Sequence, residues 1–243
     1  MKIRFALFLL WCFYFCAPVF GQKNVTTQEL LWVTYKIDLP LNEKYTIKQL
    51  IQERTYHSPW RQHQFVTTTA FDIQIGNGLS GNAAFTYFIQ TLPHDPNISD
   101  VDNRTELRPQ IELNYKNSLF DKVSLSQRFR MEFRIFEQND GSFKYQNGRF
   151  RYRLKLTYPL TQKLKVAVHN EIHLNVGSNI VQNVFDQNRA GFGFNYALRK
   201  DLNFGIDYIN WFQQRSSGVD FFNRHIVRIS VGHTVQLRRK RPQ

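Results

Sequence analysis

Charged residues occupy every second position in two stretches near the middle of the chain. Residues 128–134 alternate Arg or Glu with Phe and Met, and residues 149–155 alternate Arg or Lys with Phe, Tyr and Leu. Alternate side chains of a β-strand point to the same side, so each stretch would carry one row of charge. Rows of Arg and Lys along a water-filled passage attract anions. If Glu side chains paired with these Arg and Lys residues, the rows would instead form a structural plug of ion pairs. Buried charges have to be paired or hydrated.

Two further stretches extend this pattern, residues 104–116 before it and residues 164–176 after it. Together the four stretches predict a charged wall on one face of a sheet. This wall contains ten basic and four acidic residues, and pairing alone does not neutralise the excess of positive charge. The anion passage and the ion-pair plug therefore both stay open as interpretations. The predicted wall consists of Arg104, Glu106, Arg108, Glu112, Arg128, Arg130, Glu132, Arg134, Arg149, Arg151, Arg153, Lys155, Lys165 and Glu171.

The sequence assigns no catalytic, cofactor-binding or metal-binding residue. His169, Glu171 and His173 share one face of a predicted strand and are types that ligate transition metals, but a polar row on the wet face is the favoured interpretation. The sequence lacks the G-x-S-x-G pattern of a serine hydrolase, and the stretch Gly78-Leu-Ser-Gly81 is typical of a turn. A membrane-embedded lipid hydrolase or acyltransferase is therefore the least favoured function, and no enzymatic activity is predicted.

The first 21 residues have the pattern of a secretory signal peptide. A basic start is followed by an apolar stretch over residues 5–15 and by a small residue at Gly21. This stretch is shorter than the ~20 apolar residues of a membrane-spanning helix, so we expect residues 1–21 to be cleaved on export. Cys12 and Cys16 would leave with it, which excludes disulfides and thiol chemistry. Loss of Lys2 and Arg4 with the signal lowers the net charge from +13 to +11. This positive charge points to anions or lipid phosphate, because export makes nucleic acid improbable as a partner.

The rest of the chain is dominated by the two-residue period of β-strands, and no window shows a helical period. Short turns and longer polar loops alternate between the runs, as they do in outer-membrane barrels with short periplasmic turns and longer outer loops. Eleven runs are predicted as strands, at residues 28–38, 45–55, 63–75, 79–90, 104–116, 123–136, 149–158, 164–176, 189–198, 202–212 and 222–237.

These runs predict an all-β fold, an antiparallel transmembrane β-barrel of about 10–12 strands over residues 22–237, with a charged Arg/Glu-lined lumen. Many runs reach the ~9–11 residues that cross a bilayer, and their apolar side chains are too many for a small lumen. The arginine rows must then face inward, because an arginine facing lipid at mid-membrane costs roughly 2–4 kcal/mol. A soluble β-sandwich is the architectural alternative. Twelve strands are preferred, because bacterial barrels with both ends in the periplasm have an even number.

Aromatic residues support the expected orientation. Tyr35, Tyr115, Tyr158 and Tyr196 lie shortly before predicted short turns, and Tyr45 follows one. Tyrosines at such positions are typical of the girdle at a membrane–water interface. The sequence therefore predicts an integral protein of a bacterial outer membrane, in contact with outer-membrane lipid.

The last predicted strand, Ser230-Val-Gly-His-Thr-Val-Gln-Leu237, resembles the signal by which the barrel-assembly machinery recognises its clients, which makes that machinery an expected partner. Residues 238–243 form a basic tail, interpreted as a solvated periplasmic extension with anionic lipid as the alternative contact.

The paired Arg/Glu strands also resemble those of an uncharacterised bacterial barrel family, domain of unknown function 2490. The resemblance rests on residues 104–109, 128–134 and 149–153, with Glu171 and Arg189 fitting the pattern. It implies an outer-membrane barrel without established activity and supplies no functional residues. The functions left open are a small anion-preferring pore, with small anionic solutes as partners, and a closed structural or interaction barrel that binds a protein partner through its outer loops.

Overall fold

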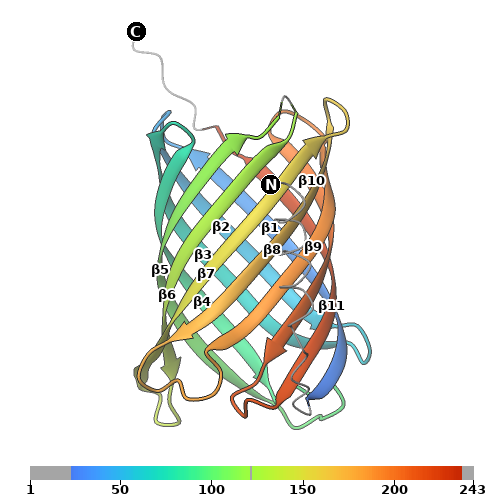
Figure 1. Cartoon of the computed structure of the whole chain (residues 1–243). Coiled ribbons are helices and arrows are strands. Elements are labelled where there is room, and N and C mark those ends of the chain that lie inside the picture. The colour runs from blue at the N-terminus through green and yellow to red at the C-terminus, as the bar shows by residue number, and fades with distance from the viewer. Residues whose placement is uncertain (1–22, 121, 237–243) are drawn as a thin grey trace, which may run out of the picture.

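The computed structural model of the chain describes residues 23–120 and 122–236 (Figure 1). The predicted signal peptide, the basic tail and the last residue of the assembly motif lie outside them. The described residues contain no helix long and apolar enough to cross a membrane. They form eleven strands: β1 (Asn24–Pro40), β2 (Tyr45–Tyr56), β3 (Arg61–Gly76), β4 (Leu79–Leu92), β5 (Asp102–Ser118), β6 (Ser124–Glu137), β7 (Phe143–Pro159), β8 (Leu164–Val176), β9 (Phe185–Ala197), β10 (Leu202–Gln214) and β11 (Asp220–Thr234).

The strands close into one barrel in chain order, with β1 hydrogen-bonded to β11. Every neighbouring pair is antiparallel except this closing pair, which is parallel from Asn24 opposite Asp220 to Asp38 opposite Thr234. An even strand number is required only where the first and last strands run in opposite directions. The parallel closure removes that requirement, so the barrel has the eleven strands counted in the sequence and not the twelve preferred on parity.

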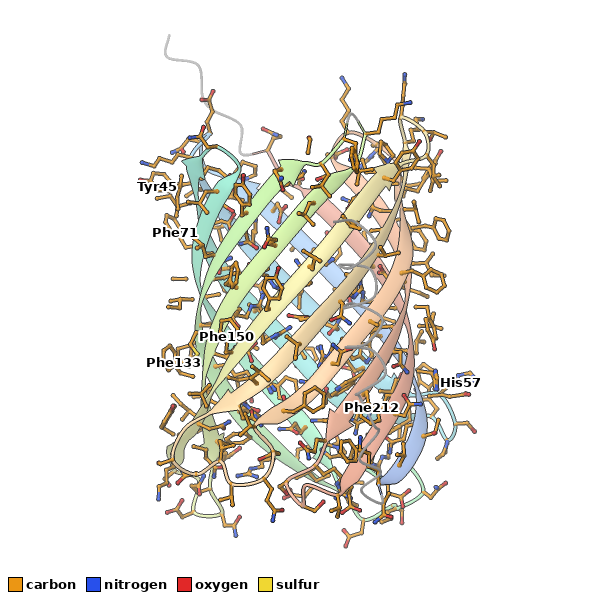
Figure 2. All side chains as sticks on the ribbon, in the orientation of Figure 1. Tyr45, His57, Phe71, Phe133, Phe150 and Phe212 are labelled. Atoms are coloured by element: carbon orange, nitrogen blue, oxygen red, sulfur yellow. The ribbon has the colours of Figure 1, made fainter. Side chains whose placement is uncertain are left out.

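The apolar rows face outward and the charged rows face inward. Phe71, Ile111 and Phe192 are about half exposed on the outer face, whereas Glu106 and Glu132 are almost completely buried. Figure 2 shows aromatic side chains projecting from the outer wall. A protein in water would bury such a surface, so this outer face is one for lipid, and the soluble sandwich alternative is wrong. The molecule is a transmembrane β-barrel of the outer-membrane type.

The two ends of the barrel differ. At one end lie the short turns and the end of β11, where the backbone N–H of Thr234 donates to the carbonyl of Asp201 and that of Val235 donates to the carbonyl of Asp38. At the other end lie the start of β1 and the two longest connections, residues 93–101 and 177–184. We call these the turn end and the loop end.

The connections at the loop end are shorter than the sequence indicated, because several strands extend beyond their apolar runs. β7, for example, starts at Phe143 rather than at residue 149. Four of the five tyrosines predicted as a girdle are exposed on the outer face, Tyr35, Tyr115, Tyr158 and Tyr196, and Tyr45 is half-buried. They lie on the strand segments next to the turn end, where a membrane–water interface is expected.

Candidate functional site in the barrel lumen

The lumen holds a polar cavity of about 390 Å³. Thirteen Lys and Arg side chains line it, against six Asp and Glu side chains. Most of these residues come from alternate positions of the strands, so the two-residue period of the sequence is what directs them inward. The cavity therefore carries a net positive charge whatever the pairing within it.

Glu132 and Glu106 each bind two arginines closely. The Glu132 carboxylate accepts from Nη2 of Arg149 and from Nη1 of Arg151, both at 2.5 Å. The Glu106 carboxylate accepts from Nε of Arg108 and from Nε of Arg134, both at 2.6 Å. Both glutamates are almost fully buried. Charge-assisted, bidentate bonds of this kind are the strong ones in proteins, so these contacts fix neighbouring strands to one another.

Two more glutamates complete this network. Glu171 accepts from Nη2 of Arg128 at 2.5 Å and from Nη2 of Arg151 at 2.9 Å. Glu112 accepts from Nη2 of Arg130 at 2.6 Å. We call these four glutamates and their six arginines the paired wall: Glu106, Glu112, Glu132, Glu171, Arg108, Arg128, Arg130, Arg134, Arg149 and Arg151.

A second group of arginines lies towards the loop end and stacks on tryptophan rings. The guanidinium carbon of Arg54 is 4.0 Å from the ring centre of Trp32. The guanidinium carbon of Arg189 is 5.4 Å from the Trp32 ring centre and 4.5 Å from the Trp211 ring centre. That of Arg224 is 4.4 Å from the Trp211 ring centre. We call these five residues the stacked layer. They come from β2, β1, β11, β10 and β9, which are five consecutive strands of the barrel on both sides of its closing pair.

The arginines of the stacked layer have no carboxylate partner. Within the described part of the chain, no Asp or Glu oxygen lies within 4.0 Å of Arg54, Arg189 or Arg224. They donate instead to glutamine side-chain oxygens at 2.6–3.2 Å: Gln52 and Gln64 for Arg54, Gln187 for Arg189, and Gln28 and Gln213 for Arg224. A glutamine oxygen satisfies a hydrogen bond without cancelling the charge, so this layer stays positive.

Behind the stacked layer the loop end of the lumen is filled. Leu30, Tyr56 and Ile226 are at most 3 % exposed and pack with the two tryptophans in one apolar cluster. His94, from the connection between β4 and β5, packs edge-on against Phe222. Burial, together with the nearby Arg224 guanidinium, lowers the pKa of His94 to about 3, so this imidazole is neutral at ordinary pH. The lumen is closed at this end in the described conformation.

The half of the cavity nearer the turn end contains three cations without partners in the described part of the chain. Lys36, Arg153 and Lys155 line it, and none has an ion pair or side-chain hydrogen bond to another described residue. Space for the cavity comes partly from small residues on β9, because a Cβ at Gly191 would lie 2.6 Å from Cε1 of His169. A solute that enters from the turn end would meet these cations before it reaches the stacked layer.

Eleven of the fourteen residues predicted for the charged wall line the cavity. Glu106 is buried in the wall behind it, and the guanidinium of Arg104 stacks on Phe136, 4.6 Å from the ring centre. Lys165 is exposed near the start of β8 and forms no ion pair with the other described residues. The prediction missed Arg54, Arg224 and the tryptophans of the stacked layer. Trp32 alternates with Thr34 and Lys36 on one strand face, and this alternation could have placed it in the lumen.

The row of His169, Glu171 and His173 faces the lumen, as its spacing indicated. The Glu171 carboxylate is bound by Arg128 and Arg151, and Nδ1 of His173 is 2.8 Å from the side-chain nitrogen of Gln187. His173 Nε2 lies 3.6 Å from Glu171. The row is thus part of the paired wall and its surroundings, and the described residues contain no cluster of His, Cys, Asp and Glu arranged to hold a metal ion.

Comparison with known proteins identifies the family of the chain. The model of DUF2490, described as a protein of unknown function, matches residues 29–223. The chain belongs to the DUF2490 family. The match covers β2 to β10 and most of β1 but only the start of β11, so the paired wall and the stacked layer apart from Arg224 are parts of the DUF2490 domain.

Two solved barrels are similar to this DUF2490 chain in structure. A NanC porin structure has 13% sequence identity and a TM-score of 0.49, and covers 82% of this chain and 91% of its own. The translocator domain of the autotransporter NalP from Neisseria meningitidis has 11% identity and a TM-score of 0.43, and covers 71% of this chain and 70% of its own. No curated protein matches the sequence.

Proposed function

We propose that this DUF2490 protein is an outer-membrane barrel whose lumen takes up small anionic solutes and conducts them with anion preference. The observation that carries the proposal is the excess of thirteen basic over six acidic side chains around one continuous cavity. In the proposed orientation the turn end faces the periplasm and the loop end faces the outside, as short turns and longer loops do in such barrels.

The physical reason is that a narrow lumen with low-dielectric walls concentrates the field of its charges. The paired wall contributes little to that field, because four glutamates offset much of the charge of its six arginines. The excess comes from the stacked layer and from Lys36, Arg153 and Lys155, none of which has a carboxylate partner among the described residues. Rings of unpaired Arg and Lys favour anions and repel cations.

The closed loop end favours a second candidate function. The apolar cluster around Trp32 and Trp211 blocks the lumen, so conduction requires the stacked layer to move. A barrel in which it never moves would be a closed structural or interaction barrel, with its loops, especially residues 91–103 and 177–188, as the binding surface. No catalytic step is part of either proposal.

Planar-bilayer recording of the purified, refolded barrel distinguishes the two. Under a KCl gradient we expect discrete openings with a reversal potential of the sign for anion preference. The double variant Arg153→Glu/Lys155→Glu should shift that potential towards cation preference, whereas Arg199→Glu, on an exposed turn outside the cavity, should leave it unchanged. A folded barrel that never conducts would overturn the pore proposal and favour the closed barrel.

A further inference from the structure

We propose that the closed end of the cavity is a binding site for one small oxyanion, the carboxylate or phosphate group of an organic solute. The site is centred on Arg189, between Trp32 and Trp211, with Arg54 beside it. The inference deepens the proposed function because it concerns the same lumen, but it does not require that the barrel conducts.

The first support is charge. Arg54 and Arg189 line the cavity, and neither has a carboxylate within ion-pair distance among the described residues. Their glutamine acceptors bear no charge, and the tryptophan rings offer only the attraction of a quadrupole. Two guanidinium charges at the floor of one cavity therefore lack the counter-charge that every arginine of the paired wall has.

The second support is an independent one, the set of unpartnered donors. The indole Nε1 of Trp32, the indole Nε1 of Trp211 and Nε of Arg189 are buried and have no hydrogen-bond partner among the described residues. An unmade hydrogen bond of a buried donor costs about 1–3 kcal/mol, so three within one layer are unusual. All three are N–H groups that only donate. An oxyanion only accepts, so it is the chemical class that suits this set.

The third support is the shape of the surroundings. Trp32, Trp211 and Ile209 line the cavity beside the two arginines, so the oxyanion site is flanked by apolar and aromatic surface. A cavity of about 390 Å³ is at the small end of the range of ligand sites. The site should therefore prefer an anion attached to a compact apolar or planar body over the bare ion.

The two tryptophans make the site measurable without any label. Of the four tryptophans, Trp11 lies in the predicted signal peptide and Trp60 is 67% exposed in a loop. In a refolded mature Trp60→Phe barrel, the emission reports Trp32 and Trp211 alone. We would titrate this barrel with benzoate, with inorganic phosphate and with benzamide, the neutral isostere of benzoate.

We expect a saturable emission change with benzoate, a weaker one with phosphate, and none with benzamide. If phosphate alone saturates the site, the solute is a phosphate and not a carboxylate. Arg189→Gln should weaken the binding at least tenfold, while Arg189→Lys should retain part of it. Arg199→Gln, the same change on an exposed turn, should bind like the parent. Heat-modified mobility on a gel verifies that each variant is folded.

The site inference is overturned if neither anion gives a saturable response, if benzamide binds as well as benzoate, or if folded Arg189→Gln binds as well as the parent. The outcome is distinct from that of the pore proposal. Anion-selective conduction without saturable binding would remove the site and leave the pore, whereas saturable binding without conduction would leave the site in a closed barrel.

Discussion

The lumen contains two groups of arginines that differ in their partners. In the paired wall each arginine binds a buried glutamate, as Arg149 binds Glu132 at 2.5 Å. In the stacked layer the arginines bind glutamine oxygens and tryptophan faces, as Arg189 does 4.5 Å from the Trp211 ring centre. The same residue type therefore cross-links strands in one region and leaves a positive field in the other. The partner, and not the arginine, decides which role results.

The largest expected effect on stability follows from the loss of a glutamate in the paired wall. Glu132→Gln would leave Arg149 and Arg151 buried with one fewer carboxylate, and breaking a buried pair costs about 3–5 kcal/mol. The free energy of unfolding, measured with urea in lipid vesicles, should fall by that amount. Glu43→Gln, on an exposed turn, is the control. A loss below about 1 kcal/mol would show that the paired wall is not what stabilises the barrel.

The next effect concerns the closure of the lumen by the stacked layer. Trp211→Ala removes a buried ring that contacts Arg189 and Arg224, at a cost of about 3–5 kcal/mol in stability. Its openings in a planar bilayer should be more frequent and larger than those of the unchanged barrel. Trp60→Ala, in an exposed loop, should conduct like the parent. If a folded Trp211→Ala barrel conducts no more than the parent, the stacked layer does not close the lumen.

A smaller effect on stability is expected when the unpaired cations near the turn end are neutralised. Arg153→Gln/Lys155→Gln breaks no ion pair among the described residues, so the free energy of unfolding should change by no more than about 0.5 kcal/mol. The anion preference, read from the reversal potential, should nevertheless decrease. A large loss of stability would instead place these two residues with the paired wall.

The effect of His94 is absent at neutral pH and appears only on acidification. Its pKa of about 3 in the folded protein lies below the ordinary value of 6.5, so the unfolded chain takes up a proton that the folded barrel does not. Stability from this group is therefore full above about pH 6.5 and falls as the pH decreases towards 3. His94→Gln should flatten the unfolding free energy over this range. An unchanged slope would show that His94 is not buried against the loop end.

The parallel closure makes a prediction about topology that involves no stability change. The chain retains no cysteine after the predicted signal, so single cysteines can be introduced at Val219 and Asn42. An impermeant maleimide added to intact cells should label the Val219→Cys variant, at the loop end, and not the Asn42→Cys variant, at the turn end. The reverse labelling would invert the proposed orientation and would place the stacked layer at the periplasmic end.

Much of the barrel follows from local pattern. Two-residue alternation at positions such as 128–134 places Arg inward and Phe outward wherever the strand lies, because a strand has only two faces. The eleven runs counted in the sequence also match the eleven strands, since each run is a separate local feature, whereas the preference for twelve strands on parity was wrong. The closure did not, because the parallel pairing of Asn24 with Asp220 joins residues almost the whole chain apart.

The candidate site was predicted only in part for the same physical reason. The paired wall lies on consecutive strands, so Glu106 and Arg134 could be seen as neighbours in the sequence pattern. The stacked layer joins β1 and β2 to β9, β10 and β11 across the seam, and its tryptophans lie in runs that are apolar on the whole. Only the register of the closed barrel brings Trp32 within 5.9 Å of Trp211 between ring centres.

The most direct test of the difference between the two groups is the free energy of unfolding of a matched pair, Arg149→Gln and Arg189→Gln. Both variants remove one inward guanidinium. We expect Arg149→Gln to cost about 3–5 kcal/mol, because it leaves the Asp186 carboxylate without an arginine and the buried Glu132 carboxylate with one fewer. We expect Arg189→Gln to cost no more than about 2 kcal/mol, because it loses stacking on two rings and one hydrogen bond to the uncharged Gln187. Equal costs for the two variants would contradict the claim that the partner decides the role of each arginine.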